Sequence, residues 1–110
     1  MLKDRLAGYM EIFHPGERYA ATSRELELTF GVTGATLRRL INTLRREGVP
    51  IASDDTGYYY AETDMEVRRT IAHMKHRISG ISAAICGLEK SLERFDTAQT
   101  RLPLGGGDDL

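Results

Sequence analysis

Apolar residues recur with helical spacing near the start of the chain. Across residues 2–13 they return every three or four positions, which predicts an amphipathic helix that ends at the proline and glycine that follow. Residues 18–21 are expected to be short and extended. Thr22 and Glu25 have the spacing of a capping box, so a second helix is predicted from this point to about Phe30.

A third helix is predicted after a tight turn. Gly31 ends the second helix and Thr33 is placed to cap the next one. The apolar residues then fall on one helical face, and mostly polar residues occupy the opposite face. The apolar face consists of Leu37, Leu40, Ile41 and Leu44. The third helix is therefore expected to bury one side and expose the other.

Short segments after the third helix have the pattern of a β-hairpin. Residues 49–53 and 58–61 are separated by a polar turn that ends in glycine. Of the three consecutive tyrosines, Tyr58 and Tyr60 are expected to pack the hairpin against the core, and Tyr59 is expected to face solvent.

The apolar pattern beyond the hairpin changes to intervals of four and three, which is the heptad signature. It predicts one long helix over residues 63–96, opened by a capping box of Thr63 and Glu66, and a flexible tail over residues 97–110. No shorter element can cover so long a stripe, and leaving its side chains in water forfeits about 1.5–3 kcal/mol each. Self-association through a coiled coil is therefore expected. The predicted oligomerisation residues are Val67, Ile71, Met74, Ile78, Ile81, Ile85, Leu88, Leu92 and Phe95.

The number and direction of the paired helices stay open at this stage. Gly80, Ala84, Gly87 and Ser91 form a second line of small residues with the same spacing. Such a line lets another helix approach closely, so an antiparallel pair or a four-helix assembly competes with a parallel dimer. A homodimer is the favoured expectation and a tetramer is the alternative.

Composition limits what these elements can build. The 110 residues are 41% apolar and 28% charged, which allows one compact domain and an appended helix. There is neither a membrane-spanning run nor a secretory leader, so a cytoplasmic protein without membrane association is expected. The single cysteine, Cys86, agrees with a reducing compartment.

Positive charge is concentrated in the third helix although the chain as a whole is nearly neutral. The formal net charge is −1, but residues 33–48 contain four arginines and one acid, Glu47. Acidic residues gather instead at Asp54 and Asp55 and at positions 108–109. Any nucleic-acid surface is therefore expected to be local.

The stretch from Thr22 to Ala61 resembles the winged helix-turn-helix domains at the N-termini of biotin-operon and DeoR-like repressors. The residues that carry the resemblance are Thr22-Ser23-Arg24-Glu25-Leu26, Phe30-Gly31-Val32-Thr33, Thr36-Leu37-Arg38-Arg39-Leu40 and Leu44-Arg45-Arg46-Glu47-Gly48-Val49-Pro50-Ile51. The fold class implied is mainly α, of the α+β winged-helix type. It has a three-helix core with a β-hairpin wing over residues 1–62 and one long C-terminal coiled-coil helix.

The resemblance implies that the third helix enters the major groove of double-stranded DNA. Arginine and asparagine have the bidentate chemistry for guanine and adenine, and threonine suits phosphate oxygens. Two departures from the family pattern are Leu40, where an acid is common, and the acidic wing tip at Asp54 and Asp55. The expected DNA-binding residues are Thr33, Ala35, Thr36, Arg38, Arg39, Asn42, Arg45 and Arg46.

Enzymatic signatures are lacking in the sequence, which contains no phosphate loop, serine elbow or catalytic carboxylate pair. His73 and His76 have no third ligand nearby, so neither a metal nor a cofactor is expected. The favoured expectation is a transcriptional regulator, most simply a repressor, that presents two recognition helices about 34 Å apart. The alternative is a protein-binding adaptor or inhibitor on the same scaffold. The architecture is similar to that of small phage or prophage proteins.

Overall fold

The computed structural model describes residues 1–99, with side chains through residue 95. Its contacts divide the chain into two units, residues 1–73 and residues 74–110, and each unit is described separately. Of the tail predicted for residues 97–110, the first three residues are helical and the remainder lies outside the described residues.

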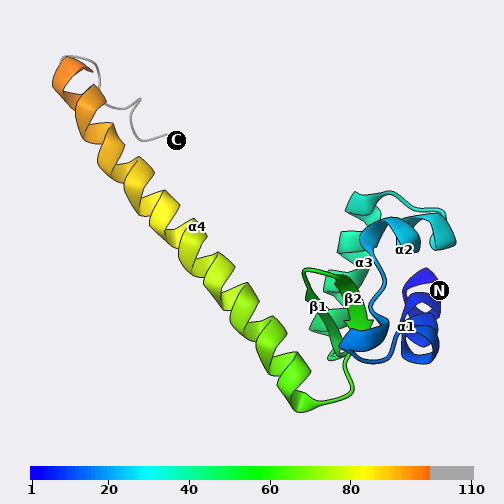
Figure 1. The fold of residues 1–110 in the computed structure, drawn as a ribbon. Coiled ribbons are helices and arrows are strands. Elements are labelled where there is room, and N and C mark those ends of the chain that lie inside the picture. Colours follow the sequence, from blue (N-terminus) through cyan, green and yellow to red (C-terminus); the bar gives the residue numbers. More distant parts are fainter. Residues whose placement is uncertain (100–110) are drawn as a thin grey trace. The chain divides into compact units, whose positions relative to one another are not determined.

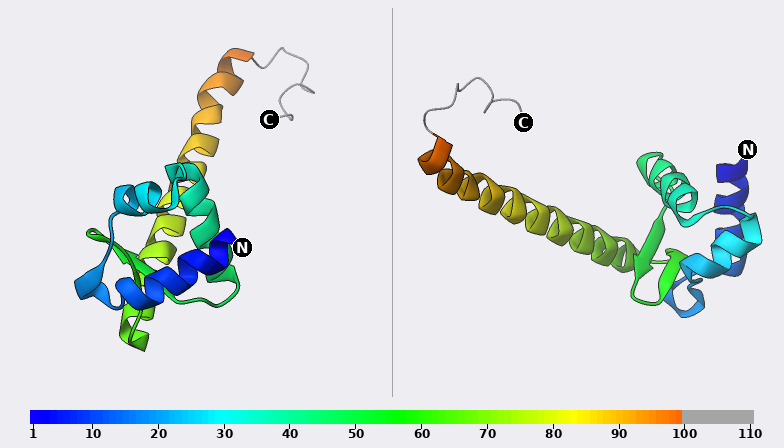
Figure 2. Two further views of the ribbon diagram at one scale, coloured as in Figure 1. Left: turned by 90° about the vertical axis from the view of Figure 1, so that its right-hand side faces the viewer. Right: turned by 90° about the horizontal axis from the view of Figure 1, so that it is seen from above.

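The predicted fold class is confirmed: the described chain is mainly helical, with one two-stranded antiparallel hairpin and a long C-terminal helix (Figure 1). Two of the three shorter α-helices contact the hairpin, and all three gather around it (Figures 1 and 2). In chain order the elements are α1 (Leu2–Phe13), the 3-10 helix η1 (Glu17–Tyr19), α2 (Ser23–Phe30), α3 (Gly34–Arg46), β1 (Ile51–Asp54), β2 (Gly57–Tyr60) and α4 (Asp64–Gln99).

Local capping sets the start of α2 and the turn from α2 to α3. The Thr22 side chain accepts a hydrogen bond from the Glu25 backbone N–H at 3.1 Å, and the Glu25 carboxylate accepts from the Thr22 backbone N–H at 2.8 Å. Gly31 ends α2 in the left-handed conformation, with φ +65°. Thr33 then caps α3. The predicted capping box, turn glycine and capping threonine are all confirmed.

The segment expected to be extended at residues 18–21 is only partly so, and the prediction is wrong for its first half. Glu17–Tyr19 form one turn of 3-10 helix. Only the end of the segment is extended, where Ala21 and Tyr58 exchange two backbone hydrogen bonds of 2.8 Å. This pairing attaches the segment to the edge of β2.

One apolar cluster joins the three helices to the hairpin. It draws on α1, α2, α3 and β1, and Tyr9 of α1 packs edge-on against Phe30 of α2 with ring centroids 5.2 Å apart. Because α3 contributes three side chains to this cluster, its opposite face is fixed toward the outside. The fully buried members are Leu6, Met10, Ala21, Leu26, Leu37, Ile41, Leu44 and Ile51.

The hairpin buries residues on both of its faces. The prediction that Tyr59 faces solvent is therefore wrong. Tyr59 is 1% exposed and pairs across the strands with Ala52, which is also 1% exposed. The neighbouring pair, Ile51 and Tyr60, lies on the other face, toward the main cluster. Successive residues of a strand point to opposite faces, so Tyr59 occupies a second buried layer.

The first turns of α4 cover this second face. Thr70 is buried, and its hydroxyl accepts from the Ser53 backbone N–H at 3.2 Å. The electrostatic neighbours of the Tyr59 hydroxyl include Glu66 and Arg69, which both lie in the same helical turns, and burial raises the pKa of this hydroxyl. The start of the long helix is therefore part of the first unit and completes its packing.

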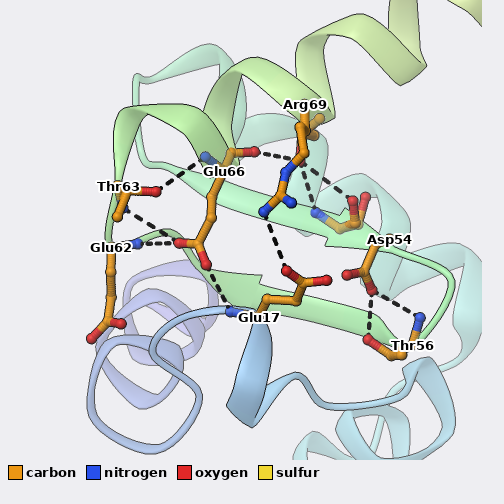
Figure 3. Close-up of polar contacts among 9 residues, drawn as sticks. Glu17, Asp54, Thr56, Glu62, Thr63, Glu66 and Arg69 are labelled. Carbon is orange, nitrogen blue, oxygen red and sulfur yellow. Dashed lines mark hydrogen bonds and ion pairs between the residues drawn. The ribbon is translucent and has the colours of Figure 1, made fainter.

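A polar network fixes the start of α4 (Figure 3). The Glu66 carboxylate accepts from the backbone N–H groups of Glu17 at 3.0 Å and Glu62 at 2.7 Å, and Arg69 forms an ion pair with Glu17 at 3.2 Å. The predicted capping box is confirmed, because Thr63 accepts from the Glu66 backbone N–H at 3.2 Å. The hydrogen bond from Glu17, with those from Glu62 and Thr63, lowers the pKa of Glu66.

Candidate nucleic-acid interface

The side of α3 opposite the core carries Ala35, Arg39, Asn42 and Arg46, and all four are exposed. We call these four residues the α3 outer face. Arg38 is also exposed and lies on one flank of this face, and Thr36 is half-buried on the other flank. The helix therefore presents three guanidinium groups and one amide to solvent over about three turns.

Threonine hydroxyls hold two of these arginines along the helix. Thr33 and Thr36 are joined through their hydroxyls at 3.2 Å, and Arg39 donates to the Thr36 hydroxyl at 3.1 Å. Two turns later, Arg46 donates to the Thr43 hydroxyl at 3.3 Å. These contacts orient guanidinium groups that otherwise sample many rotamers, which lowers the entropy cost of binding a ligand.

Thr43 is absent from the set expected from the sequence. Its hydroxyl accepts from Arg46 and donates to the backbone carbonyl of Arg39 at 2.9 Å. A signal for it was present, because Thr36, Arg39, Thr43 and Arg46 follow one another at intervals of three, four and three. Side chains at these spacings are neighbours on a helix surface.

Arg45 has a different setting from the other expected DNA-binding residues. It is half-buried, and its guanidinium donates to the Ile51 carbonyl at 2.7 Å and to the Ser53 hydroxyl at 3.1 Å. Both partners belong to β1. Arg45 therefore attaches the hairpin to α3, and the structure does not bring it into the α3 outer face.

The acid that follows α3 is neutralised locally. Glu47 accepts a hydrogen bond from Lys3 of α1 at 2.9 Å, and this contact raises the pKa of Lys3. The positive charge of the α3 outer face is therefore not offset by the acid closest to it in sequence.

The acidic wing tip contains two carboxylates with different surroundings. Asp54 is half-buried and accepts from the Thr56 backbone N–H at 2.8 Å and from the Thr56 hydroxyl at 2.5 Å (Figure 3). Burial raises the pKa of Asp54, but the hydrogen bonds with Thr56, Glu17 and the Gly57 backbone together outweigh it and lower the pKa overall. Asp55 is exposed. The tip thus carries one carboxylate that is directed into its own turn and one that faces solvent.

The apolar residues of α4 divide according to their place on the helix. Val67, in the first unit, is half-buried, as is Met74 at the start of the second. We call the seven remaining residues the α4 stripe. Their exposed fractions in the single chain range from 45% to 70%. They are Ile71, Ile78, Ile81, Ile85, Leu88, Leu92 and Phe95.

The remaining candidate functional groups of α4 are two histidines and one cysteine. His73, His76 and Cys86 are exposed, and Cys86 is a free thiol. Within the part of the chain that the structure describes, no group of three histidine, cysteine or acidic side chains could hold a metal ion. The described helices include none whose length and apolar character suit a membrane span.

Comparison of the chain with protein-family models, with curated proteins and with solved structures finds no match.

Proposed function

We propose that this protein is a sequence-specific DNA-binding regulator that reads the major groove with α3 and acts as an oligomer held together by α4. The observation that carries the proposal is the α3 outer face, where Arg39 and Arg46 are oriented by threonine hydroxyls and Asn42 lies between them. The nearest acid in sequence, Glu47, is paired with Lys3. A basic, exposed helix face on a small rigid core suits groove binding.

Within this face the residue types divide by the contacts they can make. Arg39 can donate two hydrogen bonds to guanine, and Asn42 can exchange two with adenine. Arg38 and Arg46 suit phosphate oxygens on either side of the groove, and Thr33 lies at the N-terminus of α3, where backbone N–H groups also favour phosphate. Specificity is assigned to Arg39 and Asn42, and position on the duplex to the flanking groups.

Oligomerisation supports this assignment on energetic grounds. One winged-helix unit with three exposed arginines on α3 makes few phosphate contacts, and the chain has almost no net charge to add to them. Two units on one duplex double the number of contacts and raise the effective concentration of the second unit. The α4 stripe supplies a surface that pairing would remove from water.

A protein-binding adaptor is the second candidate, favoured by one observation. Asp55 at the wing tip is exposed, and an exposed carboxylate on the wing repels the phosphates that a wing commonly contacts. On this alternative the winged-helix unit docks a protein and the α3 outer face is a solvated surface.

A salt series separates the two candidates. We expect the purified protein to shift a random-sequence duplex at about 50 mM salt and to lose affinity steeply as salt rises, because bound arginines release counterions from phosphates. A plot of the logarithm of the association constant against that of salt concentration gives the number of phosphates contacted. If no shift occurs even at low salt, the DNA proposal fails and the adaptor is favoured.

A further inference from the structure

The α4 stripe is exposed in the single chain, and the charges beside it are unevenly distributed along the helix. In the heptad, Ile71, Ile78, Ile85 and Leu92 occupy a positions, and Met74, Ile81, Leu88 and Phe95 occupy d positions. The flanking e positions hold Lys75, Ser82 and Glu89. A base therefore lies toward the start of the helix and an acid toward its end, with a small neutral residue midway.

We propose that α4 pairs with α4 of a second copy in the antiparallel direction, centred on Ala83, so that Lys75 of each chain faces Glu89 of the other. The proposal rests on the self-association in the proposed function but not on DNA binding. In this register every a residue from Ile71 to Leu92 meets a d residue of the second copy. The facing pairs are Ile71 with Phe95, Met74 with Leu92, Ile78 with Leu88 and Ile81 with Ile85, each occurring twice.

Charge complementarity selects the antiparallel direction. In an antiparallel pair e positions face e positions, so Lys75 lies beside Glu89 of the second copy at both ends. In a parallel, in-register pair e positions face g positions instead. Lys75 would then lie beside Thr70 and Glu89 beside Ala84, and neither of these neighbours carries a charge. Within the described residues, the ion pairs of the single chain include neither Lys75 nor Glu89.

The positions that flank the seam at the centre of the proposed pair are occupied by small residues. Ser82 faces Ser82 of the second copy on one side of the seam, and Ala84 faces Ala84 of the second copy on the other. The central Ile81–Ile85 pairs are therefore flanked on both sides of the seam by small side chains. Gly80 and Gly87, which weaken an isolated helix, lie on either side of this centre and have open space around them in the single chain.

Registers shifted by one heptad match less well. Moving the centre by half a heptad in either direction pairs Glu89 with Ser82 or with Arg68, and it leaves one end of the stripe without a facing apolar residue. The register centred on Ala83 is the one that pairs all eight a and d residues from Ile71 to Phe95. The shift that places Glu89 beside Arg68 also pairs opposite charges, so it is apolar pairing that selects the alignment centred on Ala83.

The proposed pairing separates the starts of the two α4 helices. The two Asp64 residues, where α4 begins in each copy, are separated by twice the distance from residue 64 to residue 83. At 1.5 Å per residue this is about 57 Å along the pair. A parallel pair places the same residues side by side. The two directions therefore differ in how far apart the starts of the two helices lie.

A charge exchange tests the direction and the register together. Dissociation constants for self-association of the full chain are measured without DNA by sedimentation equilibrium, for wild type, Lys75→Glu, Glu89→Lys and the double variant. We expect each single variant to weaken association by about tenfold, because it places like charges together at both ends, and the double variant to return within about threefold of wild type.

Conditions and controls isolate the contact between copies. At about 0.1 M salt the Debye length is about 10 Å, whereas Lys75 and Glu89 of one chain are about 21 Å apart along the helix, so coupling within a chain is screened. Lys90→Glu changes the net charge as Lys75→Glu does but lies away from the stripe, and we expect it to leave association within about threefold of wild type. Wild type that stays monomeric at micromolar concentration, or a double variant that shows only the summed losses of the single variants, would overturn the proposal.

Discussion

Replacing Tyr59 with alanine is expected to lower the free energy of unfolding of the first unit by about 3–5 kcal/mol. The ring is 1% exposed and fills the second buried layer, between the hairpin and the first turns of α4. Alanine leaves a cavity there that neither β2 nor the helix can close, because both are held by backbone hydrogen bonds. Small domains are stable by only about 5–15 kcal/mol, so this loss is a large fraction of the total.

Chemical denaturation checks this expectation and separates burial from other effects. Tyr59→Phe keeps the ring and is expected to retain most of the stability. Tyr19→Ala removes a tyrosine that is 56% exposed and is expected to change the free energy of unfolding by less than about 1 kcal/mol. If Tyr59→Ala costs no more than Tyr19→Ala, the second buried layer does not exist.

Gly57→Ala is expected to destabilise the unit by about 3 kcal/mol or more. Gly57 has φ +139°, which L side chains rarely adopt, and such strain costs about 1–3 kcal/mol. A Cβ at this position would also collide with the carbonyl group of Ala21, whose pairing with Tyr58 attaches residues 20–21 to the hairpin. The collision is with backbone, so no side-chain rotation relieves it.

Gly31→Ala is the matched control for this substitution. Gly31 has φ +65° and ψ +39°, in the left-handed helical region, and an added Cβ meets nothing within 4 Å. Only the conformational cost of about 1–2 kcal/mol is expected there. Equal losses for Gly57→Ala and Gly31→Ala in thermal denaturation would show that the close approach of Ala21 contributes nothing.

Local signals in the sequence were enough to place most elements. The Thr22–Glu25 box, Gly31 and Thr33 act within one or two turns, and each is where the sequence predicted it. The apolar periodicity of α3 likewise fixed which side is buried, since Leu37, Ile41 and Leu44 are 2% exposed or less. Helix boundaries and faces depend on neighbours three or four residues away, which a single sequence displays.

Tertiary contacts account for what the sequence did not reveal. Three identical tyrosines give no alternation, so the face of Tyr59 depends on the register with β1 and on what covers the hairpin. Its cover comes from α4, which the sequence presents as a separate heptad helix. The 3-10 turn at Glu17–Tyr19 depends in the same way on partners that are distant along the chain. The attachment of Arg45 depends on β1, which is another element.

The sequence located the residues of the candidate interface, but it did not show how their side chains are oriented. Exposure of Ala35, Arg39, Asn42 and Arg46 follows from periodicity alone. Orientation of the arginines does not, because it depends on which rotamer meets a threonine hydroxyl. The pairing of Glu47 with Lys3 joins residues 44 positions apart and has no local signature.

Equilibrium binding of an α3 variant is the measurement that tests the central claim most directly. The duplex selected by wild type from a random pool is titrated with wild type, with Arg39→Ala/Asn42→Ala and with Arg5→Ala, an exposed arginine of α1. Oligomer size is measured in parallel. We expect the double variant to bind about thirtyfold or more weakly with unchanged oligomer size, which corresponds to about 1 kcal/mol or more for each lost base contact, and Arg5→Ala to bind as wild type does. Undiminished binding by the double variant would contradict the assignment of α3 as the recognition helix.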